Sequence, residues 1–210
     1  MKITIVTSTL NPNDCLLRLI NSITSLHKIG LDYEWIIQDC VSTNGFKERM
    51  LNDCNLNFIF NSEPDYGVYD AWNRALTYAS GDFVIFLGAD DFILDWSPVL
   101  NIKDFDSVHC FGMFNISTIN GKIKDKIIFN NSMVGKTLDL PIHAFPPVPS
   151  CLFPKSLFNK KNTFNTSFKY HSDGLFFYDV IKQKNLVFHD RYLTSMGDQG
   201  LTSGYEKRME

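Results

Sequence analysis

The sequence predicts an α/β fold built on a doubly wound, mostly parallel sheet, followed by a smaller antiparallel or irregular half. Strand-like and helix-like patterns alternate four times over the first ninety residues, which is typical of βαβ units. The predicted strands are short apolar runs bounded by polar residues, as buried parallel strands are. At 210 residues the chain fits one domain, with residues 1–95 and 96–210 as its halves.

The first half contains four predicted strands and three predicted helices. A β-branched run predicts a strand over Lys2–Thr7, and apolar residues at helical spacing predict a helix over Asn11–His27, with Asn11-Pro12 at its start. The expected buried face of that helix consists of Leu16, Leu17, Ile20, Ile23 and Leu26. The further elements are strands at Tyr33–Ile37, Leu56–Phe60 and Phe83–Leu87, and helices near Phe46–Leu51 and over Val68–Ala79.

The pattern weakens beyond residue 95. Two antiparallel strands, Ser107–Phe114 and Ile119–Phe129, are expected around the Asn120-Gly121 turn. Pro141–Pro154 contains five prolines and is expected to be an irregular loop. The remaining expected elements are a helix over Asp173–Gln183, a short strand at Leu186–His189 and a mobile tail with Gly197, Gly200 and Gly204.

Composition excludes several classes of protein. Twenty Lys and Arg against 23 Asp and Glu give a net charge of −3, so we expect no nucleic-acid partner. Five cysteines without metal-ligand spacing indicate free thiols in a reducing cytosol. The first apolar run is too short for a signal peptide and no run reaches the length of a membrane span, so a cytoplasmic protein is expected.

Polar and acidic residues follow every predicted strand of the first half. Because the carboxyl ends of parallel strands meet at one edge of a sheet, where ligands bind, we expect a binding site there. The residues concerned are Thr7, Ser8 and Thr9 after the first strand, Asp39 after the second, Glu63, Asp65 and Asp70 after the third, and Asp90 and Asp91 after the fourth.

The pair Asp90-Asp91 is the candidate metal site. Adjacent carboxylates repel each other, and a divalent cation with a preference for oxygen ligands, Mg²⁺ or Mn²⁺, relieves the repulsion. The alternative is an acidic turn that caps a following short helix. The chain has no glycine-rich phosphate loop, so a metal would have to neutralise bound phosphates. This chemistry fits sugar transfer from a nucleoside diphosphate.

Four segments of the first half resemble the family 2 inverting glycosyltransferases with the GT-A fold, of the bacterial surface-polysaccharide type. The similarity covers about residues 1–95, in matching order. The segments are ITIVTSTLN (Ile3–Asn11), IIQDCVSTNG (Ile36–Gly45), SEPDYGVYDAWNRAL (Ser62–Leu76) and SGDFVIFLGADD (Ser80–Asp91). In the second half, FKYHSDGLFFYDVI (Phe168–Ile181) is similar to the stretch that carries the family's general base.

The resemblance implies a role for each matching residue. Asp91 would ligate the metal, and Asp173 would be the general base that takes the acceptor proton. The donor-binding residues would be Thr7 and Thr9 at the nucleoside, Asp39 at the base (usually uracil), Asp90 at the ribose or sugar, and Asp65 and Asp70 in support. Two alternatives stay open, a helix N-cap for Asp173 and a helix-dipole charge for Asp70.

The implied activity is transfer of a hexose or amino sugar from a UDP-sugar to a glycan or lipid-linked glycan acceptor, with Mn²⁺ or Mg²⁺. A peripheral contact with the inner face of a membrane is left open. Gly88 departs from the family at the first position of its acidic motif. The alternatives are a non-catalytic nucleotide-sugar-binding module, which Gly88 favours, and a sugar nucleotidyltransferase. Donor sugar, acceptor and oligomeric state are left open. The five histidines are scattered, with His143 and His171 beside the expected acceptor site.

Overall fold

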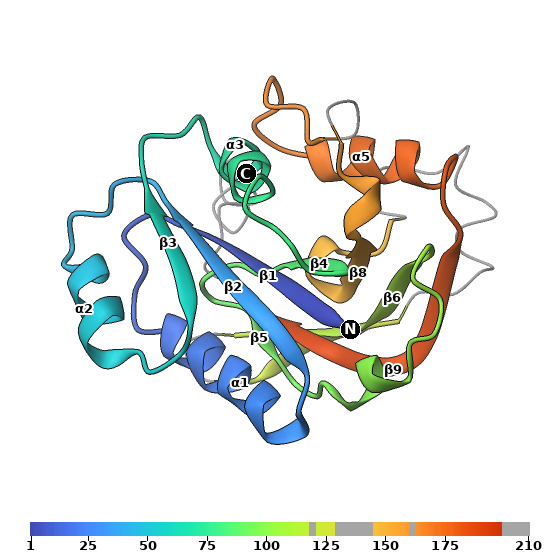
Figure 1. Cartoon of the computed structure of the whole chain (residues 1–210), viewed down its shortest axis with the longest axis horizontal. Helices are drawn as coiled ribbons and strands as arrows, with labels where there is room; N and C mark the ends of the chain where they lie inside the picture. Colours follow the sequence, from blue (N-terminus) through green and yellow to red (C-terminus); the bar gives the residue numbers. More distant parts are fainter. Residues whose placement is uncertain (118–120, 129–144, 160–162, 199–210) are drawn as a thin grey trace.

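One curved, mixed sheet runs through the molecule (Figure 1), in a computed structural model that describes residues 1–117, 121–128, 145–159 and 163–198. The strand order is β3-β2-β1-β4-β8-β6-β9-β5, and β7 pairs with β6. The strands are β1 (Lys2–Thr9), β2 (Asp32–Asp39), β3 (Phe58–Ser62), β4 (Phe83–Phe86), β5 (Phe92–Ile93), β6 (Val108–Ile116), β7 (Ile123–Ile127), β8 (Cys151–Pro154) and β9 (Leu186–Met196). The helices are α1 (Leu16–Ile29), α2 (Phe46–Asp53), α3 (Val68–Ala75) and α5 (Ser172–Val180), with 3₁₀ turns η1 (Ser97–Asn101), η3 (Val148–Ser150) and η4 (Lys155–Leu157).

The first half of the sheet is parallel. β1 pairs in parallel with β2 and with β4, and β2 pairs in parallel with β3. The register places Thr9 opposite Asp39 and Asp39 opposite Ser62, so these three strands end together. This confirms the predicted doubly wound α/β fold. The second half adds antiparallel pairs of β8 with β4 and β6, and of β5 with β9, around a parallel pair of β6 with β9.

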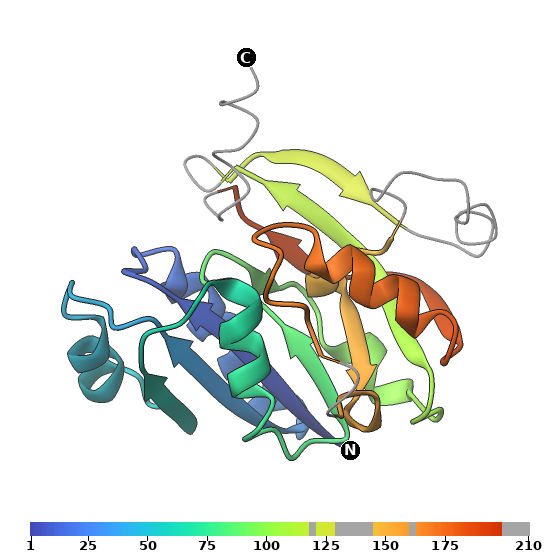
Figure 2. The same ribbon diagram turned by 90° about the horizontal axis from the view of Figure 1, so that it is seen from above.

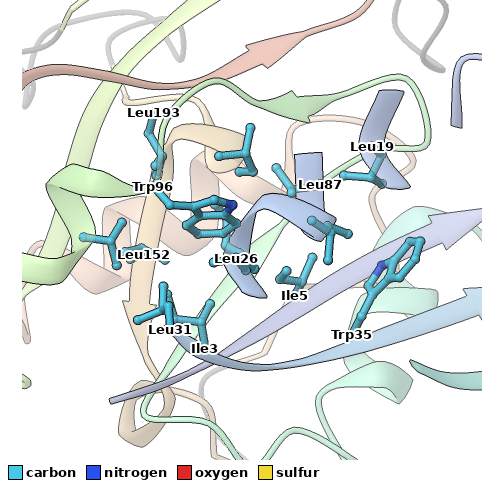
Figure 3. Packing of buried hydrophobic residues seen from close by; sticks show 14 of the residues in the cluster. Ile3, Ile5, Leu19, Leu26, Leu31, Trp35, Leu87, Trp96, Leu152 and Leu193 are labelled. Carbon is cyan, nitrogen blue, oxygen red and sulfur yellow. The ribbon is translucent and has the colours of Figure 1, made fainter. Parts of the chain in front are cut away.

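Alternate residues of the strands feed two separate cores. Ile3 and Ile5 of β1 face α1, where they pack with Leu26 and Trp96 in the cluster shown in Figure 3. Val6 of β1 belongs to the cluster on the opposite face. Because side chains alternate across a strand, one apolar run can supply both faces of a sheet. Each fully buried aliphatic side chain stabilises the fold by about 1.5–3 kcal/mol.

Helices α3 and α5 both cover the second face (Figure 2), and a hydrogen bond between Tyr69 and Asp173 joins them. Aromatic rings fill the space between these helices and the sheet. The ring of Trp72 lies 4.7 Å from that of Phe86, and Phe164 lies 4.6 Å from Phe176. Aromatic pairs at such separations add to the stabilisation that their burial gives. The packing therefore joins α3 from the first half of the chain to α5 from the second.

Helix α1 differs from the prediction at its start and on one face. The helix begins at Leu16 rather than Asn11, because Asn11 has a left-handed φ of 47° and binds Ser42 and Thr43 of a neighbouring loop. Leu17 is 58% exposed, and Leu19 takes the buried position instead. The expectation that Leu17 belongs to the core was wrong because spacing alone left the rotation of this helix undetermined.

The expected irregular loop Pro141–Pro154 is wrong over its last four residues. Cys151–Pro154 forms β8 between β4 and β6, and Pro154 stands at the very end of that strand, opposite Phe83. A proline is tolerated at a strand end, where a missing N–H costs little. Other expectations fall outside the described residues, namely those on 118–120, 129–144 and 199–210, with His143, Gly200 and Gly204. None of the described helices has the length and apolar content needed to cross a bilayer.

Glu34 ties together the edge of the sheet opposite the strand ends. Its carboxylate accepts hydrogen bonds from Lys2 at 2.7 Å, from the Thr4 hydroxyl, and from the backbone N–H groups of Ser80 and Gly81. Burial acts to raise the pKa of Glu34, but the hydrogen bonds from Lys2, Ser80 and Thr4 outweigh it and lower the pKa to about 2. One side chain of β2 thus fixes β1 and the turn that precedes β4.

We predict that Glu34→Gln lowers the free energy of unfolding at pH 7 by about 1–2 kcal/mol, as expected for lost hydrogen bonds to a charged group. Because the folded-state pKa lies below the ordinary value of 4.5, the stabilisation is present above pH 4.5 and disappears as the pH falls towards 2. Urea unfolding at pH 7, 4.5 and 3 measures this. A difference between the two proteins that stays constant with pH would contradict the assignment.

Candidate functional site

Asp39 lies at the carboxyl end of β2 and joins three strand ends. Its carboxylate is buried, and the Thr9 hydroxyl donates a hydrogen bond to it over 2.8 Å. Ser42 donates through its hydroxyl and its backbone N–H, and Ser62 donates through its hydroxyl. A carboxylate offers about four acceptor positions. These four donors therefore use the full capacity of Asp39.

The two threonines of β1 that the sequence indicates lie in different environments. Thr7 is completely buried, and its hydroxyl accepts a hydrogen bond from the Trp35 indole at 3.0 Å. Thr9 lies at the end of the strand and contacts Asp39. Thr7 therefore supports the strand from within the core, whereas Thr9 belongs to the edge of the sheet.

Asp90 and Asp91 occupy a tight turn directly after β4. The backbone N–H of Gly88 donates to Asp91 Oδ2 over 2.7 Å, and the N–H of Asp91 donates to the Gly88 carbonyl over 3.1 Å. The N–H of Leu87 donates to the carbonyl of Val6, which holds the turn beside β1. The strand β5 follows this turn rather than the short helix that the alternative interpretation required.

The environment of Asp91 is unfavourable for a free carboxylate. The residue is 3% exposed, and burial together with the charge of Asp90 raises its pKa to about 7. The N–H groups of Gly88 and Gly197 act in the other direction. A positive charge at this position would relieve the repulsion between the two carboxylates.

The end of β9 closes over the two acids. The N–H of Gly197 donates to Asp91 Oδ1 over 3.2 Å. A Cβ atom at residue 197 would lie 2.4 Å from Asp90 Oδ2, so only glycine fits there. A Cβ at Gly88 would lie 3.2 Å from one carboxylate oxygen of each aspartate. Gly88 stands at the motif position where similar sequences have an acidic residue, and it binds Asp91 through its backbone N–H.

The acid pair supplies carboxylate oxygens but no complete metal cage. In the ranges that the structure describes, no three His, Cys, Asp or Glu side chains gather into a possible metal site. Magnesium and manganese are commonly held by one or two carboxylates together with water and substrate phosphates. The residues present therefore fit a cation that arrives with a phosphorylated ligand, with Asp91 and Asp90 as its protein contacts.

Asp65 and Asp70 organise the start of α3. Asp65 accepts a hydrogen bond from the N–H of Gly67 over 2.9 Å. Asp70 accepts one from the N–H of Tyr66 and forms an ion pair with Arg74 at 3.0 Å. Arg74 also contacts Glu63 at 3.1 Å. Asp70 thus lies in the first turn of α3, as the helix-dipole alternative requires, and it also belongs to a cluster of charged side chains with Arg74 and Glu63 at the sheet edge.

Asp173 lies in the first turn of α5 and contacts α3 directly. The Tyr69 hydroxyl donates to Asp173 Oδ1 over 2.9 Å. The N-cap residue of α5 is His171, with a left-handed φ of 66°, so Asp173 is not the N-cap that the alternative proposed. Because α3 starts just after β3, this hydrogen bond places Asp173 at the same edge as the other acids.

A cavity of about 150 Å³ opens beside Asp173. The lining combines apolar and polar groups from two segments, residues 145–147 and the first turns of α5 with its N-cap: Phe145, Pro146, Pro147, His171, Asp173, Gly174 and Phe177. His171, which the sequence placed near the acceptor, is therefore a neighbour of the candidate base.

Several residues of the site were missed by the sequence interpretation. Ser42, Ser62 and Gly197 contact the predicted acids, and Tyr69 contacts Asp173. Tyr69 lies in the SEPDYGVYD segment, between the predicted site residues Asp65 and Asp70. Ser42 reaches Asp39 within a tight turn, and Ser62 and Gly197 reach Asp39 and Asp91 from segments distant in sequence. No local sequence pattern indicates these contacts.

Two of the histidines described as scattered meet in the fold. His109 Nδ1 lies 2.9 Å from His189 Nε2, and His109 Nε2 lies 2.7 Å from the Asp104 carbonyl oxygen. Burial and the neighbouring His109 lower the pKa of His189. This pair joins β6 to β9 and is not part of the acidic edge.

Known proteins resemble this chain in sequence. A family model described as glycosyl transferase family 2 matches residues 4–147. A PGL/p-HBAD biosynthesis glycosyltransferase of Mycobacterium tuberculosis is 31% identical over 85 residues, which are 37% of this chain and 32% of that protein. The Mycobacterium bovis protein of the same name matches equally. The chain therefore spans about a third of the length of these curated relatives.

Solved structures resemble the whole fold. The structure of Staphylococcus aureus TarS, residues 1–349, in complex with UDP-GlcNAc has a TM-score of 0.69 at 20% identity, covering 95% of this chain and 59% of that one. The mannosyltransferase PcManGT of Pyrobaculum calidifontis, in complex with GDP-Man and Mn²⁺, has a TM-score of 0.64 at 14% identity, covering 98% and 60%. The fold is therefore the GT-A type that the sequence predicted.

We predict that the melting temperature of Asp91→Asn relative to the wild type rises by about 5 °C between pH 5 and pH 8 without divalent cations, because the variant lacks the buried carboxylate, while its loss of one acceptor for Gly88 or Gly197 is the same at both pH values. The folded-state pKa lies above the ordinary value of 3.8, so the cost of the ionised side chain is complete above pH 7 and falls as the pH decreases from 7 towards 4. The advantage of the variant should therefore shrink at pH 5. Asp32→Asn, at an exposed strand start, is the control, and an equal gain in both variants would contradict this prediction.

Proposed function

The chain belongs to glycosyl transferase family 2, and we propose that it transfers a hexose or amino sugar from a UDP-sugar to a glycan or lipid-linked glycan acceptor with inversion. The observation that carries the proposal is the Tyr69–Asp173 hydrogen bond. It joins a carboxylate from the second half of the chain to α3, the helix that follows β3 at the acidic edge of the sheet. Family membership supports the reaction class, and this arrangement supports the proposed choice of residues.

The donor would lie along the carboxyl ends of β2, β1 and β4. We place the nucleoside by Thr9 and Asp39, and the sugar by Asp90, with Asp65 and Asp70 supporting the loop before α3. UDP is favoured because TarS, a structure similar to this one, holds UDP-GlcNAc. PcManGT holds GDP-Man, which makes the guanine nucleotide the competing donor type.

Thr7 supports this donor site from beneath, since its hydroxyl faces Trp35. Asp39 is already saturated by Thr9, Ser42 and Ser62. A base N–H can reach its carboxylate only if one of these hydroxyls turns away. We therefore propose that, when the sugar donor binds, the hydroxyl of Ser42 or Thr9 releases Asp39 and donates its hydrogen bond to the nucleoside instead.

Mn²⁺ or Mg²⁺ would be held by Asp91 with help from Asp90. A bound divalent cation would neutralise the charge that develops on the departing diphosphate. The raised pKa of Asp91 supports this assignment, because a buried pair of carboxylates gains from a cation. The relative PcManGT was solved with Mn²⁺.

The acceptor would enter the cavity beside Asp173. An acceptor hydroxyl attacks the anomeric carbon from the face opposite the diphosphate, so that one carbon–oxygen bond forms while the bond to the diphosphate breaks. Asp173 takes the hydroxyl proton, and the diphosphate leaves with the electron pair of the broken bond. Phe145, Pro146 and Phe177 of the same cavity would keep bulk water from Asp173.

The two alternative functions have different support. A sugar nucleotidyltransferase would need a phosphate loop after β1, and TSTLNPND lacks one. A non-catalytic binding module is favoured by Gly88, which removes one potential metal ligand. Its N–H, however, binds Asp91, so the glycine has a structural role that is compatible with turnover.

We predict that the protein releases UDP from a UDP-sugar in the presence of Mn²⁺, and that Asp173→Asn lowers the turnover number by about 10²- to 10⁴-fold because the general base is lost. Asp91→Asn should reduce the response to Mn²⁺. Coupled detection of UDP with a panel of UDP-hexoses and UDP-N-acetylhexosamines measures both effects.

Asp179→Asn is the matched control, because Asp179 lies on the same helix and is exposed. It should keep wild-type turnover. Equal turnover in the wild type and in Asp173→Asn would overturn the assignment of the base. Binding of UDP and Mn²⁺ without turnover by any donor of the panel would favour the binding-module alternative.

A further inference from the structure

We propose that Tyr69 is a positioning residue for the general base, with a hydroxyl that fixes the orientation of the Asp173 carboxylate and stabilises its ionised form. This inference rests on the proposed function, in which Asp173 takes the acceptor proton. The geometric basis is the 2.9 Å hydrogen bond between Tyr69 on α3 and Asp173 on α5, two residues 104 positions apart in the chain.

The ring of Tyr69 is held firmly by its neighbours. The residue is 7% exposed, and its ring stacks on Phe164 at 5.8 Å and meets the edge of Trp72 at 5.6 Å. Phe164 is fixed in turn by a two-point hydrogen bond of its backbone with the Asn73 amide, at 2.8 and 3.0 Å. A ring with so few free movements can present its hydroxyl in one direction only.

The hydroxyl acts as a hydrogen-bond donor to the base throughout the accessible pH range. Burial and the charge of Asp173 raise the pKa of Tyr69 well above its ordinary value. The Tyr69 oxygen also interacts with the backbone N–H groups of Ser172 and Asp173, at the start of α5. Tyr69 therefore gives the N-terminus of α5 a side-chain partner that its own N-cap, His171, does not provide.

The hydrogen bond leaves the second carboxylate oxygen for the reaction. Oδ1 of Asp173 is occupied by Tyr69, and within the described ranges Oδ2 has no hydrogen-bond partner. In the proposed step Oδ2 takes the proton of the acceptor hydroxyl, while Tyr69 keeps its own proton. Because one oxygen is anchored, the carboxylate cannot rotate away from the cavity that it lines.

Few of the described charged or titratable groups lie near Tyr69 and Asp173. His171 lines the same cavity as Asp173, and on α3 the next charged groups, Asp70 and Arg74, are paired with each other. On α5 the nearest further acid, Asp179, lies close to Lys182 at 3.5 Å. Because His171 lines the same cavity as Asp173, the pH test uses a His171→Gln background as a reference.

The first test is the pH dependence of UDP release by Tyr69→Phe, which keeps the ring and removes only the hydroxyl. We expect the turnover number to fall about ten- to hundredfold, the fold-change that loss of one hydrogen bond to a charged group produces. We also expect the acidic limb of the profile to move to higher pH, while the KM for the donor stays unchanged. The control Tyr178→Phe, on the exposed side of α5, should behave as wild type.

A double-mutant cycle separates positioning from general support of the fold. In an Asp173→Asn background, Tyr69→Phe should lower turnover no further, because its effect acts through the carboxylate. An undiminished loss in that background would overturn the proposal. So would an unshifted acidic limb in Tyr69→Phe.

A measurement without turnover distinguishes failure of this inference from failure of the proposed function. Carbon-13 NMR of the aspartate carboxyl carbons, with Asp173 identified by the signal missing from Asp173→Asn, follows its hydrogen bonding directly. At a fixed pH the Asp173 carboxyl signal should change its chemical shift in Tyr69→Phe and keep it in Tyr178→Phe, because only the first variant loses the hydrogen bond. An unchanged Asp173 signal in Tyr69→Phe would overturn the positioning role, whether or not the enzyme releases UDP.

Discussion

β1 pairs in parallel with β2 on one side and with β4 on the other, and the rest of the site depends on this arrangement. Parallel neighbours end at the same edge of the sheet. Thr9, Asp39 and the turn with Asp91 therefore lie together in space although they are far apart in the sequence. The apolar side chains of the same strands alternate between two cores, which holds their register. A slip by one residue would exchange the two faces and separate these polar groups.

The acids of this edge are held by the protein's own donors. Asp39 receives four hydrogen bonds, and Asp91 receives those of Gly88 and Gly197. Buried carboxylates without such partners would be costly. A bound sugar nucleotide and its cation would therefore replace hydrogen bonds that exist in the free protein. Because Gly197 lies close to Asp90, any ligand at the acid pair would also contact the end of β9.

The sequence predicted the parallel half well because its signals are local. Apolar runs such as Phe83–Leu87 and the polar residues after them can be recognised without knowledge of distant contacts. The position of β8 could not be predicted, since Cys151–Pro154 becomes a strand only because β4 and β6 offer pairing edges on both sides. Tyr69 was missed for the same reason, as its partner lies on another helix. Residues whose roles come from long-range contacts leave no pattern along the chain.

We propose that this edge of the sheet binds a nucleoside diphosphate through a divalent cation at Asp91. Thermal denaturation with UDP or GDP, each with and without Mn²⁺, tests it most directly, because a ligand that binds only the folded state raises the melting temperature. We expect the melting temperature to rise with UDP and Mn²⁺ together and this rise to be lost in Asp91→Asn. A rise with GDP but not UDP, or a response to UDP that is independent of both Mn²⁺ and Asp91, would contradict it.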